Sequence, residues 1–195
     1  MRIIALVSTL LLIACAGTPP SHTHYLLRAD VPERTARVEA PASVGLLRVD
    51  VAPYLKQSGL VLATGDHQVR PARYHKWAEP LDEGLRRFLR AEISNALGSD
   101  VSAESVQQSQ WDYAVRVSVD QLHGTLSGEA MLIASWRITR GGGTDEVAEF
   151  RLARSEPLAR EGYAGLVDAE IGLARQLAVA IADSLRDLVE EHTAD

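Results

Sequence analysis

The stretch Tyr113-Ala114-Val115-Arg116-Val117-Ser118-Val119-Asp120 alternates large apolar side chains with small or polar ones. Successive side chains of a strand point to opposite faces, so this period of two predicts a half-buried β-strand. Two segments of similar character follow at residues 130–138 and 147–153, and glycines separate the three segments. We therefore expect a β-meander in the C-terminal half of the chain.

A helical period flanks this meander on both sides. Between residues 80 and 97, apolar side chains recur every three or four positions, which predicts an amphipathic helix. Pro80 suits its first position, Asp82 and Glu83 suit its first turn, and Gly98 suits the position just beyond its end. A longer stripe predicts a second helix over roughly residues 165–191, and its members are Leu166, Leu173, Leu177, Ile181, Leu185 and Leu188.

The N-terminal half contains short β-rich runs before the first helix. They lie at residues 24–28, 44–51, 60–63 and 67–70, and Gly65-Asp66 marks a hairpin turn between the last two. Strands and helices joined by hairpins, rather than by repeated βαβ units, favour an α+β fold. We expect one domain over residues 24–195, with a single antiparallel or mixed sheet and two main helices packed on one face.

The first residues have the character of an export signal. Arg2 is followed by a run of uncharged, mostly apolar residues to Ala14, which is shorter than the roughly 20 apolar residues that cross a bilayer. Leu12-Ile13-Ala14-Cys15 resembles the lipobox of bacterial lipoproteins. We expect residues 1–14 to be a signal peptide and Cys15 to carry the lipid. An ordinary secretory signal with an incidental cysteine is the alternative.

The residues around this cysteine agree with lipidation. Cys15 is the only cysteine in the chain, and an unpaired thiol is a liability in an oxidising compartment unless it is modified. Residues 15–23 would then be the lipidated cysteine and a flexible tether, with His22 and His24 as solvated residues rather than metal ligands. In lipoproteins of diderm bacteria an Asp after the cysteine favours the inner membrane. Ala16 therefore favours the periplasmic face of the outer membrane.

Composition and motifs narrow the classes of function. The chain has a net charge of −6, which becomes −7 when Arg2 leaves with the signal peptide, and no cluster of Lys and Arg predicts a nucleic-acid partner. No nucleophile elbow, phosphate-binding loop or zinc-protease motif is present. Gly141-Gly142-Gly143 lies between two expected strands, so we interpret it as a hairpin tip. We expect no catalytic residue, no metal and no cofactor.

One segment concentrates aromatic residues in a chain that has few of them. Tyr74 and Trp77 lie within Arg73-Tyr74-His75-Lys76-Trp77-Ala78-Glu79-Pro80, just before the first predicted helix. Trp and Tyr are frequent at the centres of protein interfaces. We therefore regard both as candidate partner-binding residues, with a place in the core beside the helix start as the alternative for Trp77.

A family resemblance rests on three short motifs that follow the lipobox along the sequence. They are Tyr25-Leu26-Leu27, then Val51-Ala52-Pro53-Tyr54-Leu55 with Leu60-Val61-Leu62, then Trp77-Ala78-Glu79-Pro80-Leu81 at the start of a helix. The chain resembles the ABC-type transport auxiliary lipoprotein family, which includes the PqiC-type lipoproteins. The order of elements matches from about Tyr25 to the final helix.

The resemblance implies a role in trafficking lipids across the bacterial envelope. Members accompany periplasmic MCE-domain proteins and, through them, ABC permease and ATPase components, and can form homo-oligomeric rings. It implies no catalytic residues, and only Cys15 carries over, as the acylation site. We expect a docking subunit of such a transport system that supports envelope integrity. A periplasmic carrier domain for lipid or another ligand is the alternative, and a periplasmic enzyme is a more distant one.

Overall fold

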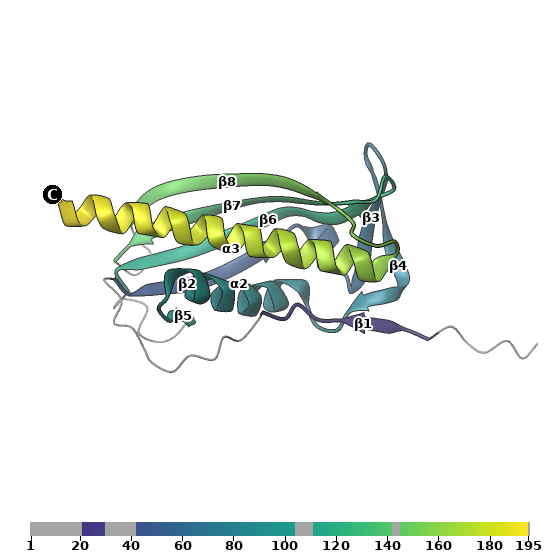
Figure 1. The fold of residues 1–195 in the computed structure, drawn as a ribbon, viewed down its shortest axis with the longest axis horizontal. Helices are drawn as coiled ribbons and strands as arrows, with labels where there is room; N and C mark the ends of the chain where they lie inside the picture. Colours follow the sequence, from purple (N-terminus) through teal and green to yellow (C-terminus); the bar gives the residue numbers. More distant parts are fainter. Residues whose placement is uncertain (1–20, 30–41, 104–110, 142–144, 195) are drawn as a thin grey trace, which may run out of the picture.

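The computed structural model of the chain describes residues 21–29, 42–103, 111–141 and 145–194. The elements follow one another along the chain as shown in Figure 1. They are β1 (Thr23–Tyr25), β2 (Val44–Val51), the short 3₁₀ helix η2 (Pro53–Leu55), β3 (Gly59–Gly65), β4 (Gln68–Trp77), α2 (Leu81–Leu97), β5 (Val101–Ala103), β6 (Tyr113–Thr125), β7 (Glu129–Arg140), β8 (Asp145–Pro157) and α3 (Tyr163–Ala194).

The eight strands form one mixed, open sheet with β6 at its centre. β6 pairs antiparallel with β7, which pairs antiparallel with β8. Along its other edge β6 pairs parallel with β2 over residues 113–119 and with β3 over residues 124–125. The sheet extends through parallel β5 beside β2, and through β4 and then parallel β1 beyond β3. This confirms the expected α+β fold with a mixed sheet.

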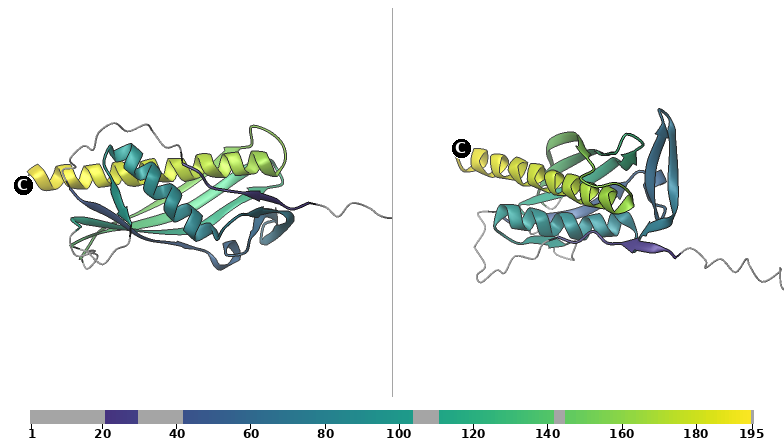
Figure 2. Two further views of the ribbon diagram at one scale, coloured as in Figure 1. Left: turned by 90° about the horizontal axis from the view of Figure 1, so that it is seen from below. Right: turned by 45° about the vertical axis from the view of Figure 1, so that its right-hand side comes forward.

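Both helices cover the same face of the sheet and pack against each other (Figures 1 and 2). α3 lies along β6, β7 and β8, whereas α2 lies over β2 and β5. The main core fills the space between these layers. On α3, Leu173, Leu177 and Ile181 have no exposed surface at all. Alternate residues of β7 meet them from the sheet, as the period of two requires.

The two long helices begin and end close to where the sequence pattern places them. α2 begins at Leu81, so Pro80 is the residue that precedes the helix rather than its first residue. Its φ of −54° and ψ of 131° suit an entry to a helix but not the helix itself. Gly98 has a φ of +74°, a left-handed conformation that glycine adopts without strain.

The strands differ more from the sequence-based expectation. β6, β7 and β8 each extend beyond the segments with clear alternation, and β4 continues through Trp77 instead of stopping at residue 70. β1 is shorter than expected, and the three-residue strand β5 was not expected at all. The added residues of β6, β7 and β8 pair mainly with one another across the meander. The end of β4 pairs with β1, which is distant in sequence and which the local pattern cannot indicate.

The opposite face of the sheet carries a second, small apolar cluster of Leu47, Trp111 and Ala114. The Trp111 ring lies over Gly45 of β2, where a Cβ atom would be 2.0 Å from ring atom Cε3. Glycine is therefore required at residue 45 for the indole to pack on the strand. A hydrogen bond joins the residues that precede β2 and β6 beside this cluster: the Ser43 backbone N–H donates to the Asp112 carboxylate at 2.8 Å.

Candidate functional site

The predicted site residues fall in different surroundings. Cys15, the expected acylation site, lies outside the described residues, so its acylation stays a prediction. Tyr74 and Trp77 both lie on β4, where residues three apart point to opposite faces of the strand. The structure therefore does not bring these two side chains together on one surface.

Trp77 is a core residue at the end of β4. Its side chain is only 7% exposed and belongs to the main apolar cluster. Its backbone N–H donates to the Ser58 carbonyl at 2.7 Å, and its register partner on β1 is Tyr25. The indole thus fills the core where β1, β3 and β4 meet, and offers little surface to a partner.

Tyr74 is half-buried and lies beside the start of the described chain. His22 meets its ring edge-on, with ring centroids 5.6 Å apart, and the Arg73 guanidinium lies 5.3 Å from its centroid. Part of the phenol stays accessible next to a cation. Such a site suits a protein contact, and partner binding by Tyr74 stays a prediction.

A second aromatic group ties the first strand to the last helix. Tyr25 of β1 shares a 3.0 Å hydrogen bond with Nδ1 of His75 on β4, and His75 stacks on Tyr163 at the start of α3 with centroids 4.2 Å apart. Burial raises the pKa of the Tyr25 phenol, and the nearby Arg160 charge opposes that rise. The N-terminal strand is thereby fixed to the beginning of α3.

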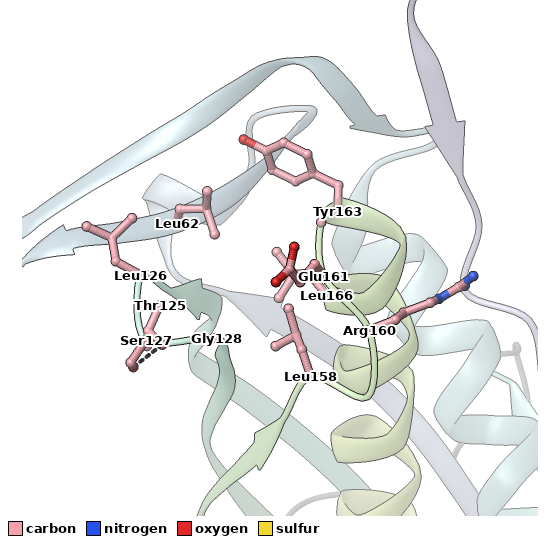
Figure 3. Close-up of a pocket in the computed structure, with 11 residues that line it drawn as sticks. Leu62, Thr125, Leu126, Ser127, Gly128, Leu158, Arg160, Glu161, Tyr163 and Leu166 are labelled. Atoms are coloured by element: carbon pink, nitrogen blue, oxygen red, sulfur yellow. Dashed lines mark hydrogen bonds between the residues drawn. The ribbon is translucent and has the colours of Figure 1, made fainter.

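A pocket of about 570 Å³ lies next to this group, within the roughly 300–1,000 Å³ range of small-molecule sites. Figure 3 shows side chains from three places on its walls: Leu62 of β3, the β6–β7 turn, and the segment leading into α3. Tyr163 is part of the wall, so the aromatic group and the pocket share a residue. Leu62, Leu126, Leu158 and Leu166 make much of the lining apolar.

The turn that borders the pocket is held by its own polar groups. The Gly128 backbone N–H donates to the Thr125 carbonyl at 3.3 Å, and Gly128 has a φ of +82°. The Glu129 backbone N–H donates to the Thr125 hydroxyl at 3.1 Å. Leu126 takes part in none of these bonds and is 70% exposed. The turn therefore presents a leucine that its geometry does not require.

A buried carboxyl lies one helical turn beyond the pocket. Glu170 of α3 is four residues after Leu166, is 1% exposed, and its Oε2 atom has no hydrogen-bond partner. Burial raises the pKa of this carboxyl well above 4.5. Tyr54 of η2 and His123 of β6 have ring centroids 6.2 Å apart, and burial also raises the pKa of the Tyr54 phenol.

A further polar contact joins the two helices. Arg175 of α3 donates from Nε to Oε2 of Glu92 on α2 at 3.3 Å, and Glu92 is 8% exposed. Within the described ranges no three His, Cys, Asp or Glu side chains gather as a metal site would require. No helix among the same residues combines the length and apolar character needed to cross a membrane.

With this geometry in place, the chain can be compared with known proteins. The model of the ABC-type transport auxiliary lipoprotein component matches residues 25–182, from the last residue of β1 into α3. The chain belongs to this family. The family is one of transport auxiliary lipoproteins and not of enzymes.

Two curated relatives cover nearly the whole chain. The intermembrane transport lipoprotein PqiC of Escherichia coli is 27% identical over 187 residues, which are 93% of this chain and 96% of the relative. The protein of the same name from Shigella flexneri matches equally well. The family resemblance seen in the motifs is therefore confirmed over 93% of the chain.

Solved structures share the fold at lower identity. The crystal structure of an uncharacterized protein has a TM-score of 0.72 at 23% identity, covering 85% of this chain and 99% of its own. That of a Xanthomonas campestris protein has a TM-score of 0.70 at 13% identity, covering 88% and 98%. These likenesses concern the fold alone.

The sequence did not point to the pocket or to the His75–Tyr163 stack. These residues come from segments far apart in the chain, and His75 had no neighbour in sequence that suggested a partner. One local signal was available: Leu126 stands in Thr125-Leu126-Ser127-Gly128, where polar residues and glycine are the usual choice.

Proposed function

We propose that the protein is an outer-membrane lipoprotein, acylated on Cys15, that serves as a docking subunit of an ABC/MCE-type intermembrane lipid transport system. One observation carries the proposal: the family match spans residues 25–182, and relatives over 93% of the chain are named intermembrane transport lipoproteins. Its partners would be a periplasmic MCE-domain protein and, through it, an ABC permease and ATPase. This role would support envelope integrity.

Physical chemistry favours such a subunit. A lipid that crossed the aqueous periplasm alone would expose its hydrocarbon chains to water, at about 0.8 kcal/mol for each CH₂ group. A protein bridge avoids that exposure. A tethered domain at the target membrane raises the effective concentration of the bridge's end there, without needing a tight contact.

Self-association into a ring belongs to the same proposal. A ring needs two unlike patches that meet head to tail. Three strands of the sheet, β1, β5 and β8, each pair with only one other strand among the described residues and could supply such patches. Light scattering of the acylated protein in detergent, alone and with its partner, would test the ring.

The deciding experiment measures membrane attachment and partner capture in the parent protein and in two variants near the expected anchor. Affinity-tagged full-length protein should float with the outer-membrane fraction and capture an MCE-domain protein from detergent extracts. Cys15→Ala should release the protein from membranes, and Ala16→Asp should move it to the inner-membrane fraction. Unchanged membrane attachment of Cys15→Ala would refute the anchor. Full attachment with no MCE-domain protein captured would refute the docking role alone.

The alternative of a carrier domain needs a cavity that encloses a ligand. Between the helices and the sheet the described core is filled, since Leu89, Ile93 and Leu173 have no exposed surface. The pocket at the β6–β7 turn instead includes exposed residues in its wall. This arrangement supports docking more than carriage. Stoichiometric phospholipid retained by the purified protein in native mass spectrometry would favour the carrier.

A further inference from the structure

One end of the domain gathers the start of the described chain, the pocket and two hairpin turns. Figures 1 and 2 show β1, the β3–β4 and β6–β7 hairpins and the start of α3 together at this end, with the C-terminus at the opposite end. Contacts between these elements agree with this arrangement: Thr23 pairs in register with His75, and His75 stacks on Tyr163 of the pocket wall.

The position of the expected lipid follows from chain length. Thr23 lies eight positions after Cys15, and a fully extended chain spans at most about 3.6 Å per residue step, or about 29 Å here. The acylated cysteine therefore stays within that distance of β1. A membrane that holds the lipid lies near the pocket end of the domain, whereas α3 carries the chain away from it toward the C-terminus.

The same end exposes the apolar surface that such a membrane would cover. Leu126 is the most exposed of the large hydrophobic residues in the described ranges, at 70%, against 47% for Val69 and 46% for Val179. Single exposed apolar residues are common and need no explanation. Leu126, however, lines the same pocket as Leu62, Leu158 and Leu166. Its exposed side chain and these apolar walls therefore form one continuous apolar surface, and the pocket is called the groove below.

Charges around the groove do not prevent this contact. Arg160 donates from Nε and Nη2 to Oδ2 of Asp168 at 2.9 and 2.6 Å, which neutralises the cation beside the groove. Glu161 also lines the groove and is exposed, so its carboxylate would lie at the level of lipid headgroups and water. The leucines would then face the hydrocarbon, as in other interfacial contacts.

We propose that this end of the domain docks on the membrane leaflet that holds its anchor, with Leu126 entering the leaflet and the groove receiving part of a phospholipid chain. The proposal rests on the anchoring part of the proposed function. It adds a second contact, which orients the domain on the membrane and which no match to a relative assigns. Because the anchor already provides a high effective concentration, a single leucine and a shallow groove suffice.

A fluorescent label at residue 126 tests the proposal in the full-length acylated protein. Acylation converts the thiol of Cys15 into a thioether, so Leu126→Cys provides the one reactive thiol for an NBD probe. Parent protein that takes up no probe confirms that Cys15 is blocked. Val179→Cys is the matched control, because Val179 is also exposed but lies 16 residues along α3 from Tyr163, about 24 Å at 1.5 Å per residue.

The labelled proteins are reconstituted in phosphatidylethanolamine–phosphatidylglycerol vesicles. The probe at residue 126 should show blue-shifted emission and lose intensity when the vesicles contain lipid with a doxyl group on the acyl chain. The probe at residue 179 should show neither change. An unshifted probe at residue 126 would overturn the proposal, as would a blue shift without doxyl quenching, since protein rather than lipid would then cover the residue.

The same preparation separates this inference from the proposed function. Flotation with the vesicles reports the anchor, and the probe reports the docked end. Protein that does not float overturns both the anchoring and this inference. Protein that floats with a water-exposed probe at residue 126 overturns this inference alone and leaves the transport role as it stands.

Discussion

His75 of β4 stacks on Tyr163 at the start of α3, with ring centroids 4.2 Å apart and ring planes inclined at 20°. The two residues are 88 positions apart in sequence, and the contact joins the N-terminal edge of the sheet to the helix that covers it. Because Tyr25 also hydrogen-bonds to His75, the stack fixes the strand through which the chain would connect to its anchor.

Breaking the stack should lower stability by an amount that a double-mutant cycle can isolate. Paired aromatic rings contribute about 0.5–1.5 kcal/mol beyond the area they bury. We expect His75→Ala and Tyr163→Ala each to lower the free energy of unfolding, with a coupling energy in that range for the pair. Urea unfolding measures all four proteins. His67→Ala, at the exposed tip of the β3–β4 hairpin, should be close to neutral, and purely additive effects would contradict the coupling.

Gly165 and Gly172 both lie in α3, but the space beside them differs. A Cβ at residue 165 would lie 1.9 Å from the Arg160 backbone carbonyl, whereas one at residue 172 would meet the Glu156 carboxylate at 2.8 Å. Backbone cannot move aside as a flexible side chain can. We expect Gly165→Ala to cost about 1–3 kcal/mol of unfolding free energy. Gly172→Ala should be neutral or gain up to about 1 kcal/mol from helix propensity.

Thermal or urea unfolding of these two variants provides its own control, because the substitution and the helix are the same. Equal effects at the two positions would show that the approach of the loop to α3 does not constrain residue 165. A loss at residue 165 alone would show that glycine is needed there so that the segment before α3 can form the pocket wall.

The sequence predicted those parts of the fold that a local period records. The two helices and the meander from β6 to β8 have apolar side chains at regular intervals, because each buries one continuous face. β5 has only three residues, and β1 pairs with β4, some 50 residues away in the chain. Neither has a pattern of its own, since their stability comes from strands that are distant in sequence.

The candidate site could be predicted from the sequence pattern only in small part. The segment of Tyr74 and Trp77 was interpreted as an approach to a helix because Pro71 and several charged residues obscure its strand character. As part of β4, its two aromatic residues point to opposite faces, so one enters the core and one does not. The pocket could not be anticipated, because its walls come from three segments that only the tertiary fold brings together.

The buried carboxyl of Glu170 should make stability depend on pH. Burial raises its pKa in the folded state well above 4.5, while the unfolded chain has the ordinary value. As pH rises above about 4.5, the unfolded chain releases this proton but the folded protein retains it. The free energy of unfolding should therefore fall with rising pH until the folded carboxyl also ionises. Below 4.5 the group has no such effect.

Two substitutions separate ionisation from packing at residue 170. Glu170→Gln and Glu170→Met both remove the ionisable group, and only the second removes the polar atoms. Urea unfolding across this pH range should show a smaller decline of stability with pH in both variants than in the parent. If the parent and both variants decline in parallel, the carboxyl is not the group responsible.

Tyr74 and Trp77 should respond differently to replacement by alanine, because only Trp77 is buried. Trp77→Ala should lower the free energy of unfolding by about 3–5 kcal/mol, as expected for a large aromatic removed from a core. Tyr74→Ala should cost about 1 kcal/mol or less but reduce capture of the MCE-domain partner by the folded protein. Urea unfolding and quantitative pull-down measure the two effects separately.

Arg73→Ala tests whether the neighbouring cation contributes to the same contact. If Tyr74→Ala captures the partner as well as the parent does, the binding surface lies elsewhere on the domain, since this phenol is the part of the aromatic segment that a partner could reach.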